Sequence, residues 1–319
     1  MSLSVDRSLT WVIGAGGLLG QALAAVLRRH DRGTVVTTRI LWTDVDESRA
    51  ALRTFLRAFL DRAGATNAIW RIAWCAGAGV TGTSATTLSN EVATFAYFVG
   101  ELTALAPPAS GTLFLASSAG GIYAGSTTPP FTEMHQPHPL SPYGEAKLAA
   151  ESVAGRFAHD TGNAVIVGRI ANLYGPGQNL AKSQGLVSHL CRAHLTGQPL
   201  SIYVSLDTIR DYLFVEDCAS MIDDAMTAGH HGADPLATKI LASQQGTTVG
   251  ALIGECRRVF KRTPRLVLGT STNARFQVKD LRLRSAVWPE LDRRALTTLP
   301  AGLAATAASL LRSAQLARF

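Results

Sequence analysis

The sequence predicts an α/β fold, with a doubly wound parallel sheet followed by a smaller C-terminal α/β domain. Strand-like apolar runs alternate with helix-like segments through the first two-thirds of the chain. A glycine-rich turn joins the first strand to the first helix, and the rhythm becomes irregular after Pro176. We therefore expect a large domain over residues 1–176, to which the chain returns around 207–228, and a smaller one over residues 177–319.

Each expected element has its own signal. The strands are short apolar runs at residues 9–14, 34–42, 68–77, 111–118 and 164–175. The helix-like segments are longer and cover residues 18–30, 47–64 and 90–105, with a further helix from Ser141 onward. Ser141 and Pro142 mark that last start, because Ser is a favoured N-cap and Pro a favoured first helical residue.

Composition places the chain among globular proteins. It has 319 residues, 47% of them apolar and 17% charged. No apolar run approaches the roughly 18 residues of a membrane span, and the first residues form no signal-peptide pattern. The four cysteines are widely scattered, so we expect neither disulfides nor a metal site, and we expect a cytoplasmic protein.

The formal net charge of +7 leaves two kinds of partner open. Basic residues cluster at 27–32 and 256–265, but without the aromatic interleaving of a nucleic-acid platform. Nucleic acid is therefore not an expected partner. A surplus of positive charge also suits an anionic small-molecule substrate.

The glycine-rich turn predicts a dinucleotide site of the Rossmann type. Gly14 permits a tight turn, Gly17 lets the backbone approach a pyrophosphate, and Gly20 lets the helix pack close to the strand. The helix that begins with Leu18 and Leu19 then offers free N–H groups and a positive dipole end to the phosphates.

The end of the second strand bears on the choice of dinucleotide. An acidic residue there usually binds the adenosine ribose, but this chain has Thr38 followed by Arg39. A guanidinium can pair with a 2′-phosphate, so NADP is slightly favoured over NAD. The alternative is that Arg39 is a solvated residue at the strand end.

Tyr143 and Lys147 are four residues apart in the helix that begins at Ser141. Their phenol and ammonium groups therefore lie one turn apart on one face. This spacing is common by chance, and the surrounding motifs decide its meaning.

Five motifs occur in order along the chain: "GAGGLLG", "SSAGGIYAG", "SPYGEAK", "NLYGPGQ" and "RDYLFVED". Together they resemble the extended short-chain dehydrogenase/reductase family, in its nucleotide-sugar epimerase/dehydratase branch. The resemblance covers nearly the whole chain and reaches residues 297–311, which look like the family's closing amphipathic helix. It implies an NAD(P)-dependent enzyme whose smaller domain binds a nucleotide-sugar.

The resemblance also implies catalytic roles. Tyr143 would be the acid/base, and Lys147 would favour the phenolate and hydrogen-bond the nicotinamide ribose. Ser118 would polarise the reacting oxygen. One residue more than is typical lies between that serine and Tyr123, so Ser117 is an alternative.

Further residues match the family's binding positions. Asn172 would lie near the sugar or its phosphates, and Arg210 would pair with the diphosphate unless it only forms a surface salt bridge. Arg275 is a weaker candidate for a second phosphate ligand. On the cofactor side Ala76 is a candidate, and "TDVDES" looks like the family's acidic motif that holds adenine, with Asp44 or Asp46 as the candidate residue. The alternative is that these carboxylates are the acidic start of a helix.

The expected reaction follows from two residues after the serine pair. Dehydratases of this family carry an acid pair there, whereas this chain has Ala119 and Gly120, so 4,6-dehydration is unlikely by this criterion. A 4-epimerase and a 4-ketoreductase both stay open. The competing class of function is a non-catalytic dinucleotide-binding regulator or an RNA-associated member of the same superfamily.

The resemblance further implies a homodimer. In it, residues 90–105 and the helix from Ser141 would form a four-helix bundle with the same two helices of the second subunit.

Overall fold

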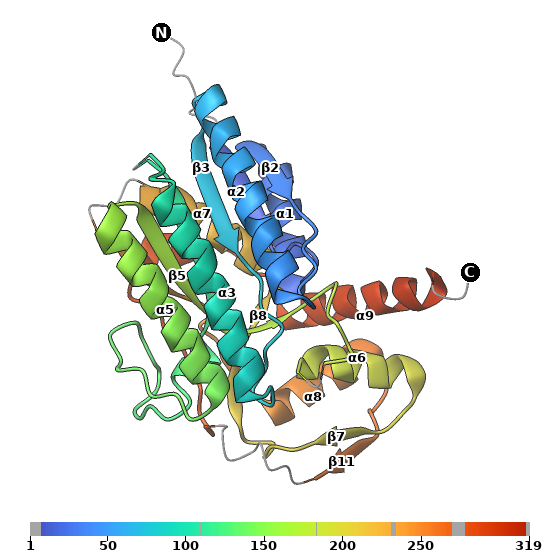
Figure 1. Ribbon diagram of the computed structural model, residues 1–319. Coiled ribbons are helices and arrows are strands. Elements are labelled where there is room, and N and C mark those ends of the chain that lie inside the picture. The colour runs from blue at the N-terminus through green and yellow to red at the C-terminus, as the bar shows by residue number, and fades with distance from the viewer. Residues whose placement is uncertain (1–7, 109, 183, 231–233, 270–277, 317–319) are drawn as a thin grey trace.

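The central layer of the molecule is a sheet of six parallel strands (Figure 1). The computed structural model describes residues 8–108, 110–182, 184–230, 234–269 and 278–316. The strand order is β2-β1-β3-β4-β5-β9. The strands are β1 (Ser8–Ile13), β2 (Gly33–Thr37), β3 (Ile69–Trp74), β4 (Thr112–Ser118), β5 (Ala164–Ile170) and β9 (Leu236–Leu241). The predicted doubly wound α/β fold is confirmed.

Helices cover both faces of this sheet. α1 (Leu18–His30) and α7 (Val215–His230) pack side by side on one face, and α2 (Val45–Thr66), α3 (Ala85–Ala104) and α5 (Pro142–Thr161) cover the other. Side chains of a strand point alternately to the two faces. Val12 of β1 accordingly joins the core under α1, while Trp11 and Ile13 join the core under α2 and α3.

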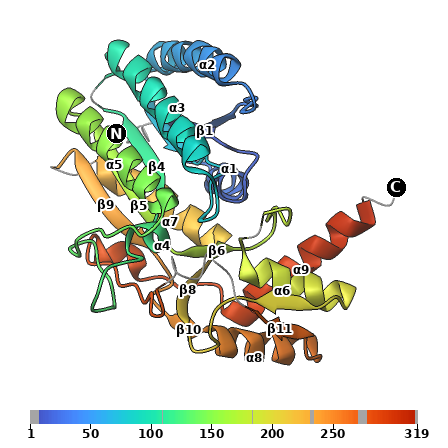
Figure 2. The ribbon, with the colours of Figure 1, turned by 60° about the horizontal axis from the view of Figure 1, so that its bottom comes forward.

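A smaller lobe with its own apolar core lies beyond the carboxyl ends of the strands (Figure 2). Its helices are α6 (Leu186–Thr196), α8 (Val249–Phe260) and α9 (Leu299–Leu316). Its strands form a three-stranded sheet of β10 (Gly246–Thr248), β8 (Ile209–Phe214) and β6 (Asn172–Tyr174), and a pair of β11 (Leu266–Leu268) and β7 (Leu200–Ile202). The division into two domains near residue 176 stays a prediction, with α7 and β9 belonging to the large sheet and its layers.

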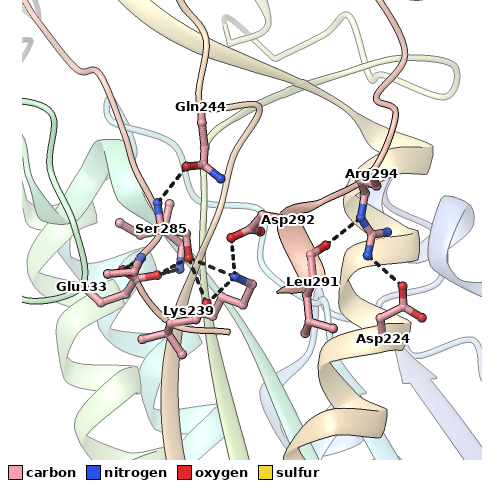
Figure 3. A network of polar contacts seen from close by, with 11 residues as sticks. Glu133, Asp224, Lys239, Gln244, Ser285, Leu291, Asp292 and Arg294 are labelled. Atoms are coloured by element: carbon pink, nitrogen blue, oxygen red, sulfur yellow. Dashed lines mark hydrogen bonds and ion pairs between the residues drawn. The ribbon is translucent and has the colours of Figure 1, made fainter. Parts of the chain in front are cut away.

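A buried polar cluster holds the C-terminal segment against β9 (Figure 3). The ammonium of Lys239 donates to Ser285 Oγ (2.9 Å), to the Val287 carbonyl oxygen (2.7 Å) and to Asp292 Oδ2 (3.0 Å). Ser285 Oγ in turn donates to Glu133 Oε1 (2.6 Å). We call Glu133, Lys239, Ser285 and Asp292 the Lys239 cluster. Because Glu133 lies in the loop that leads to α5, the cluster joins three distant parts of the chain.

The two helices expected to form the dimer lie side by side. α3 and α5 pack against each other over the same face of the sheet, as Figure 1 shows. The homodimer itself stays a prediction. Among the helices that the structure describes, none is both long and apolar enough to cross a membrane.

Candidate active site

A cavity of about 750 Å³ opens at the carboxyl ends of the central strands. It lies at the point where the strand order turns, because the chain passes from β1 to β2 on one side and then returns to β3 on the other. Its walls come mainly from six segments, within residues 14–18, 38–48, 74–78, 87–95, 143–150 and 177–182.

The glycine loop between β1 and α1 forms part of the cavity wall. Gly14 has a φ of +85°, and a Cβ on it would lie 2.6 Å from the amide nitrogen of Ala76. A Cβ on Gly20 would overlap the carbonyl group of Gly14. Both positions therefore require glycine, and α1 begins in close contact with the turn.

The first turn of α1 points unpaired N–H groups toward this end of the cavity. Gly17 is the N-cap, and Gln21 is the first residue whose N–H bonds back to it, at 2.9 Å. The N–H groups of Leu18, Leu19 and Gly20 therefore have no acceptor within the helix. Gly17 and Leu18 line the cavity, whereas Leu19 and Gly20 are buried behind them. Such a helix start suits an anion.

Tyr143 and Lys147 both line the cavity, one turn apart on α5. The Ser141 side chain caps α5 and so fixes where the helix begins and where Tyr143 points. The Lys147 ammonium donates to the Ala116 carbonyl oxygen (3.1 Å) at the end of β4 and lies 5.8 Å from the centroid of the Tyr143 ring. The structure thus brings the predicted pair and the glycine loop to one cavity.

The Tyr143 ring packs on the short helix α4 (Ala119–Ile122), which follows the two serines. A Cβ on Gly121 would lie only 3.0 Å from Tyr143 Cε1. A Cβ on Gly144 would overlap the Gly121 carbonyl oxygen, so the two glycines let α4 and α5 approach closely. This packing brings the turn that carries Ser118 next to Tyr143.

The two serines make different hydrogen bonds. Ser117 Oγ donates to Glu151 Oε1 (2.6 Å), and the other oxygen of this buried carboxylate, Oε2, pairs with Arg169 Nη2 (2.7 Å). Ser118 Oγ accepts the Gly121 N–H (3.2 Å), so its own hydroxyl hydrogen stays available for a ligand. This difference favours Ser118 over Ser117 as a donor, although neither serine is among the residues that line the cavity.

The predicted substrate residues belong to the three-stranded sheet of the smaller lobe. Asn172 is half-buried in β6, and its Oδ1 would lie 3.8 Å from a Cβ on Gly120. Arg210 is buried in β8, where its Nη1 donates to the Val278 carbonyl oxygen (2.8 Å) and burial lowers its pKa. Arg275 lies outside the described residues. The ligand roles of all three stay predictions.

Of the predicted cofactor residues Arg39, Ala76 and Asp44, the first two line the cavity and the third does not. Arg39 is exposed and lines the cavity, and Ala76 lines it after β3. Asp44 is not among the lining residues, because its Oδ1 accepts the Glu47 N–H (2.9 Å) as the cap of α2. For Asp44 the structure therefore shows the helix-start role, and a contact with adenine stays a prediction. The Thr38 hydroxyl accepts the Trp11 indole N–H (3.0 Å).

Two charged residues of the cavity wall belong to none of the motifs. Glu91 Oε1 accepts the N–H groups of Ala78 (2.8 Å) and Gly79 (2.9 Å), and Lys182 donates to the Ala78 carbonyl oxygen (3.1 Å). Together they fix the loop after β3 from both sides. Neither has a local sequence signal, since Glu91 is one of several polar residues in its helix and Lys182 lies where the rhythm is irregular.

Cys75 lines the cavity after β3. Burial raises the pKa of its thiol to about 12, and the Lys147 ammonium opposes this only in part. The thiol therefore stays protonated at neutral pH and does not provide a thiolate nucleophile. Within the described residues no group of three or more His, Cys, Asp or Glu side chains could hold a metal ion.

Comparisons with known proteins agree with this geometry. The dTDP-glucose 4,6-dehydratase of Haemophilus influenzae is 35% identical over 104 residues, which is 33% of this chain and 30% of that protein. The dTDP-4-dehydro-6-deoxyglucose reductase of Escherichia coli is 31% identical over 105 residues, which is 33% of each chain. The matched part thus spans about a third of these relatives.

Solved structures extend the likeness to nearly the whole chain. The structure of MoeE5 in complex with UDP-glucose and NAD has a TM-score of 0.78 with 22% identity, and the match covers 96% of this chain and 99% of that one. At this identity the likeness shows the fold alone.

The relatives include dehydratases, so the prediction that dehydration is unlikely finds no support in these comparisons. The profile of the NAD dependent epimerase/dehydratase family matches residues 10–238, which is more than half of the chain. The predicted family is therefore confirmed, and the chain belongs to the NAD dependent epimerase/dehydratase family.

Proposed function

We propose that this chain is an NAD(P)-dependent enzyme that transfers a hydride at a carbon of a nucleotide-diphospho-sugar. The observation that carries the proposal is that Tyr143 and Lys147 line the same cavity as the glycine loop. Proteins similar to this chain are named for dTDP-sugar reactions, and the similar MoeE5 was solved with UDP-glucose and NAD.

The residues present fit a dinucleotide, which would supply the hydride acceptor or donor. Gly14 and Gly20 leave room for backbone only, and the free N–H groups at the start of α1 suit a pyrophosphate. The cavity volume of about 750 Å³ lies within the range of small-molecule sites. The exposed Arg39 suits a 2′-phosphate, so we keep NADP slightly ahead of NAD.

Tyr143 would move the proton of the reacting sugar hydroxyl. A phenol is a weak base at neutral pH, and a nearby positive charge favours its phenolate form. Lys147 supplies that charge, and with one N–H on Ala116 it has two more for ribose hydroxyls. The Ser118 hydroxyl would donate to the same sugar oxygen as Tyr143. These roles stabilise charge on that oxygen while the hydride is transferred.

Within this class we propose reaction at C4 of the sugar, as an epimerase or a ketoreductase. Ala119 and Gly120 bring no carboxylate to the turn beside Tyr143, which favours these reactions over elimination of water. Arg210 and Asn172 would hold the diphosphate and the sugar, since a guanidinium pairs well with phosphate.

The test is incubation with UDP-, GDP- and dTDP-sugars and their 4-keto forms, with NAD or NADPH, followed by chromatography and mass measurement. An epimer keeps the mass of its substrate, a reduced product gains two hydrogens, and an elimination product loses one water. Conversion by neither hydride transfer nor elimination, in a chain that still binds a dinucleotide, would favour the non-catalytic regulator.

Tyr143→Phe is the matched variant for that test. We expect turnover to fall by about 10²- to 10⁴-fold, as for loss of a general acid/base, with unchanged dinucleotide affinity. A Tyr143→Phe chain that keeps wild-type turnover would refute the assigned proton transfer.

A further inference from the structure

We propose that the indole of Trp42 is the surface on which the adenine ring of the dinucleotide stacks. The inference rests on the proposed function, because it concerns the adenosine end of the same cavity. Trp42 lines that cavity in the short connection between β2 and α2.

The order of the strands decides which end of the cavity takes adenosine. The connection after β2 lies at one edge of the sheet, and the glycine loop follows the neighbouring strand β1. Tyr143 and Lys147 lie on the far side, on α5, which packs against β4 and β5. In folds of this type the end of the second strand meets the adenosine ribose. With the pyrophosphate on the glycine loop, the adenine base therefore lies beside residues 38–45.

The surface of Trp42 suits a planar base. Trp42 is 45% exposed, although tryptophan is usually well buried. The buried Trp74 lies beside it, with ring centroids 6.1 Å apart and an interplanar angle of 76°. Trp74 in turn packs against Phe95 and Phe98, each at 5.0 Å. Trp42 is thus held at an edge-to-face contact by a buried aromatic group while nearly half of its surface stays open.

Several polar side chains near this end already make contacts within the protein. The Asp44 carboxylate caps α2, the Ser48 hydroxyl donates to the Val45 carbonyl oxygen (2.8 Å), and Thr38 accepts from Trp11. Beside Arg39 and Thr43, the wall around Trp42 includes the apolar side chains of Ile40 and Val45. The geometry therefore points to recognition through the face of the base rather than through hydrogen bonds to its edge. Stacking of this kind tolerates different bases.

The experiment measures equilibrium binding of NAD, AMP and nicotinamide mononucleotide to the wild-type chain and to Trp42→Ala by calorimetry. Base–aromatic stacking predicts affinities for NAD and AMP that are about 5- to 150-fold weaker in Trp42→Ala. Binding of nicotinamide mononucleotide, which lacks the adenine, should be unchanged. Trp42→Phe keeps an aromatic face and should retain most of the affinity.

Leu41→Ala is the matched control, because Leu41 is adjacent, 55% exposed and not among the residues that line the cavity. It should bind NAD like the wild type. Nicotinamide hypoxanthine dinucleotide, which replaces the adenine amino group with oxygen, should bind the wild type within a few-fold of NAD, as stacking predicts. Circular dichroism checks that every variant is folded.

Equal affinities of folded Trp42→Ala and wild type for NAD and AMP would overturn the inference and leave the proposed function intact. Strong discrimination against the hypoxanthine dinucleotide would also overturn it, in favour of edge recognition. A wild-type chain that binds AMP through Trp42 but no dinucleotide would refute the proposed function alone. A chain that binds none of these nucleotides would overturn both.

Discussion

Lys147 and Lys239 lie beside the same central sheet in opposite surroundings. Lys147 is half-buried in the cavity wall, and within the described residues its ammonium donates one hydrogen bond, to Ala116. Lys239 is 0% exposed and donates three, to Ser285, the Val287 carbonyl oxygen and Asp292. An ammonium has three N–H donors. All three N–H donors of Lys239 are therefore used within the protein, whereas Lys147 keeps two N–H donors for a ligand.

This difference separates a lysine that holds the fold together from one that is available for chemistry. A buried charge is tolerated only when its partners are present, so the Lys239 cluster depends on all of its members. Around Lys147 solvent or a ligand can replace a lost contact. The same residue type thus predicts different consequences of mutation at the two positions.

The largest effect on stability is expected for Lys239→Ala. Removing the ammonium leaves the Asp292 carboxylate without its buried partner, which costs about 3–5 kcal/mol in the free energy of unfolding. Urea unfolding followed by circular dichroism measures this loss. Lys147→Ala is the matched comparison and should cost less than about 1 kcal/mol while abolishing most of the turnover. Equal losses of stability in the two variants would break the comparison.

Asp211 tests, with a buried acid, the rule that a buried charge is tolerated only when its partners are present. It lies in β8, where burial raises its pKa to about 6 and hydrogen bonds such as that from the Ser243 N–H (2.8 Å) oppose the shift. The folded state then binds this proton more tightly than the unfolded state does. The free energy of unfolding therefore falls as the pH rises from about 4 to about 6.

Asp211→Asn keeps the acceptor oxygen but removes this titration. Relative to the wild type, its free energy of unfolding should rise by about 2 kcal/mol between pH 4 and pH 7, because most of the shift of about two pKa units is titrated in this range. Urea unfolding of both chains at the two pH values measures the change. A difference between the chains that does not depend on pH would show that Asp211 is not held protonated in the folded state.

The parts that could be predicted from the sequence depend on local patterns. The glycine loop and the alternation of strands and helices are encoded within short stretches, and both the fold and the family they indicated are confirmed. Tyr143 and Lys147 meet in the cavity because the cap at Ser141 and the helical period are also local.

The parts that escaped prediction depend on contacts between distant residues or on competition between roles. Glu133 and Ser285 are 152 positions apart, so no local pattern announces the Lys239 cluster. Lys239 lies in β9, the sixth strand of the sheet, which comes after the region where a return of the chain was expected. Asp44 shows the second cause, because the sequence left both the helix start and the adenine contact open, and the hydrogen bond to the Glu47 N–H shows the first of these roles.

The smallest effect is expected at Glu91, which resembles Lys147 in its exposure and Lys239 in its commitment to hydrogen bonds. Its Oε1 holds two backbone N–H groups of the loop after β3. In Glu91→Ala water can replace the carboxylate at this half-exposed position, so dinucleotide affinity should fall only about 5-fold, which corresponds to about 1 kcal/mol, the lower end for a backbone donor that loses its partner. Glu91→Gln keeps an acceptor oxygen at the same place, which can still accept from the loop N–H groups, and should bind within about 2-fold of the wild type. Calorimetric titration with NAD measures both variants.

Equal losses of NAD affinity in Glu91→Ala and Glu91→Gln would mean that the negative charge acts on the cofactor site directly. An unchanged NAD affinity in Glu91→Ala would mean that Lys182 alone holds the loop.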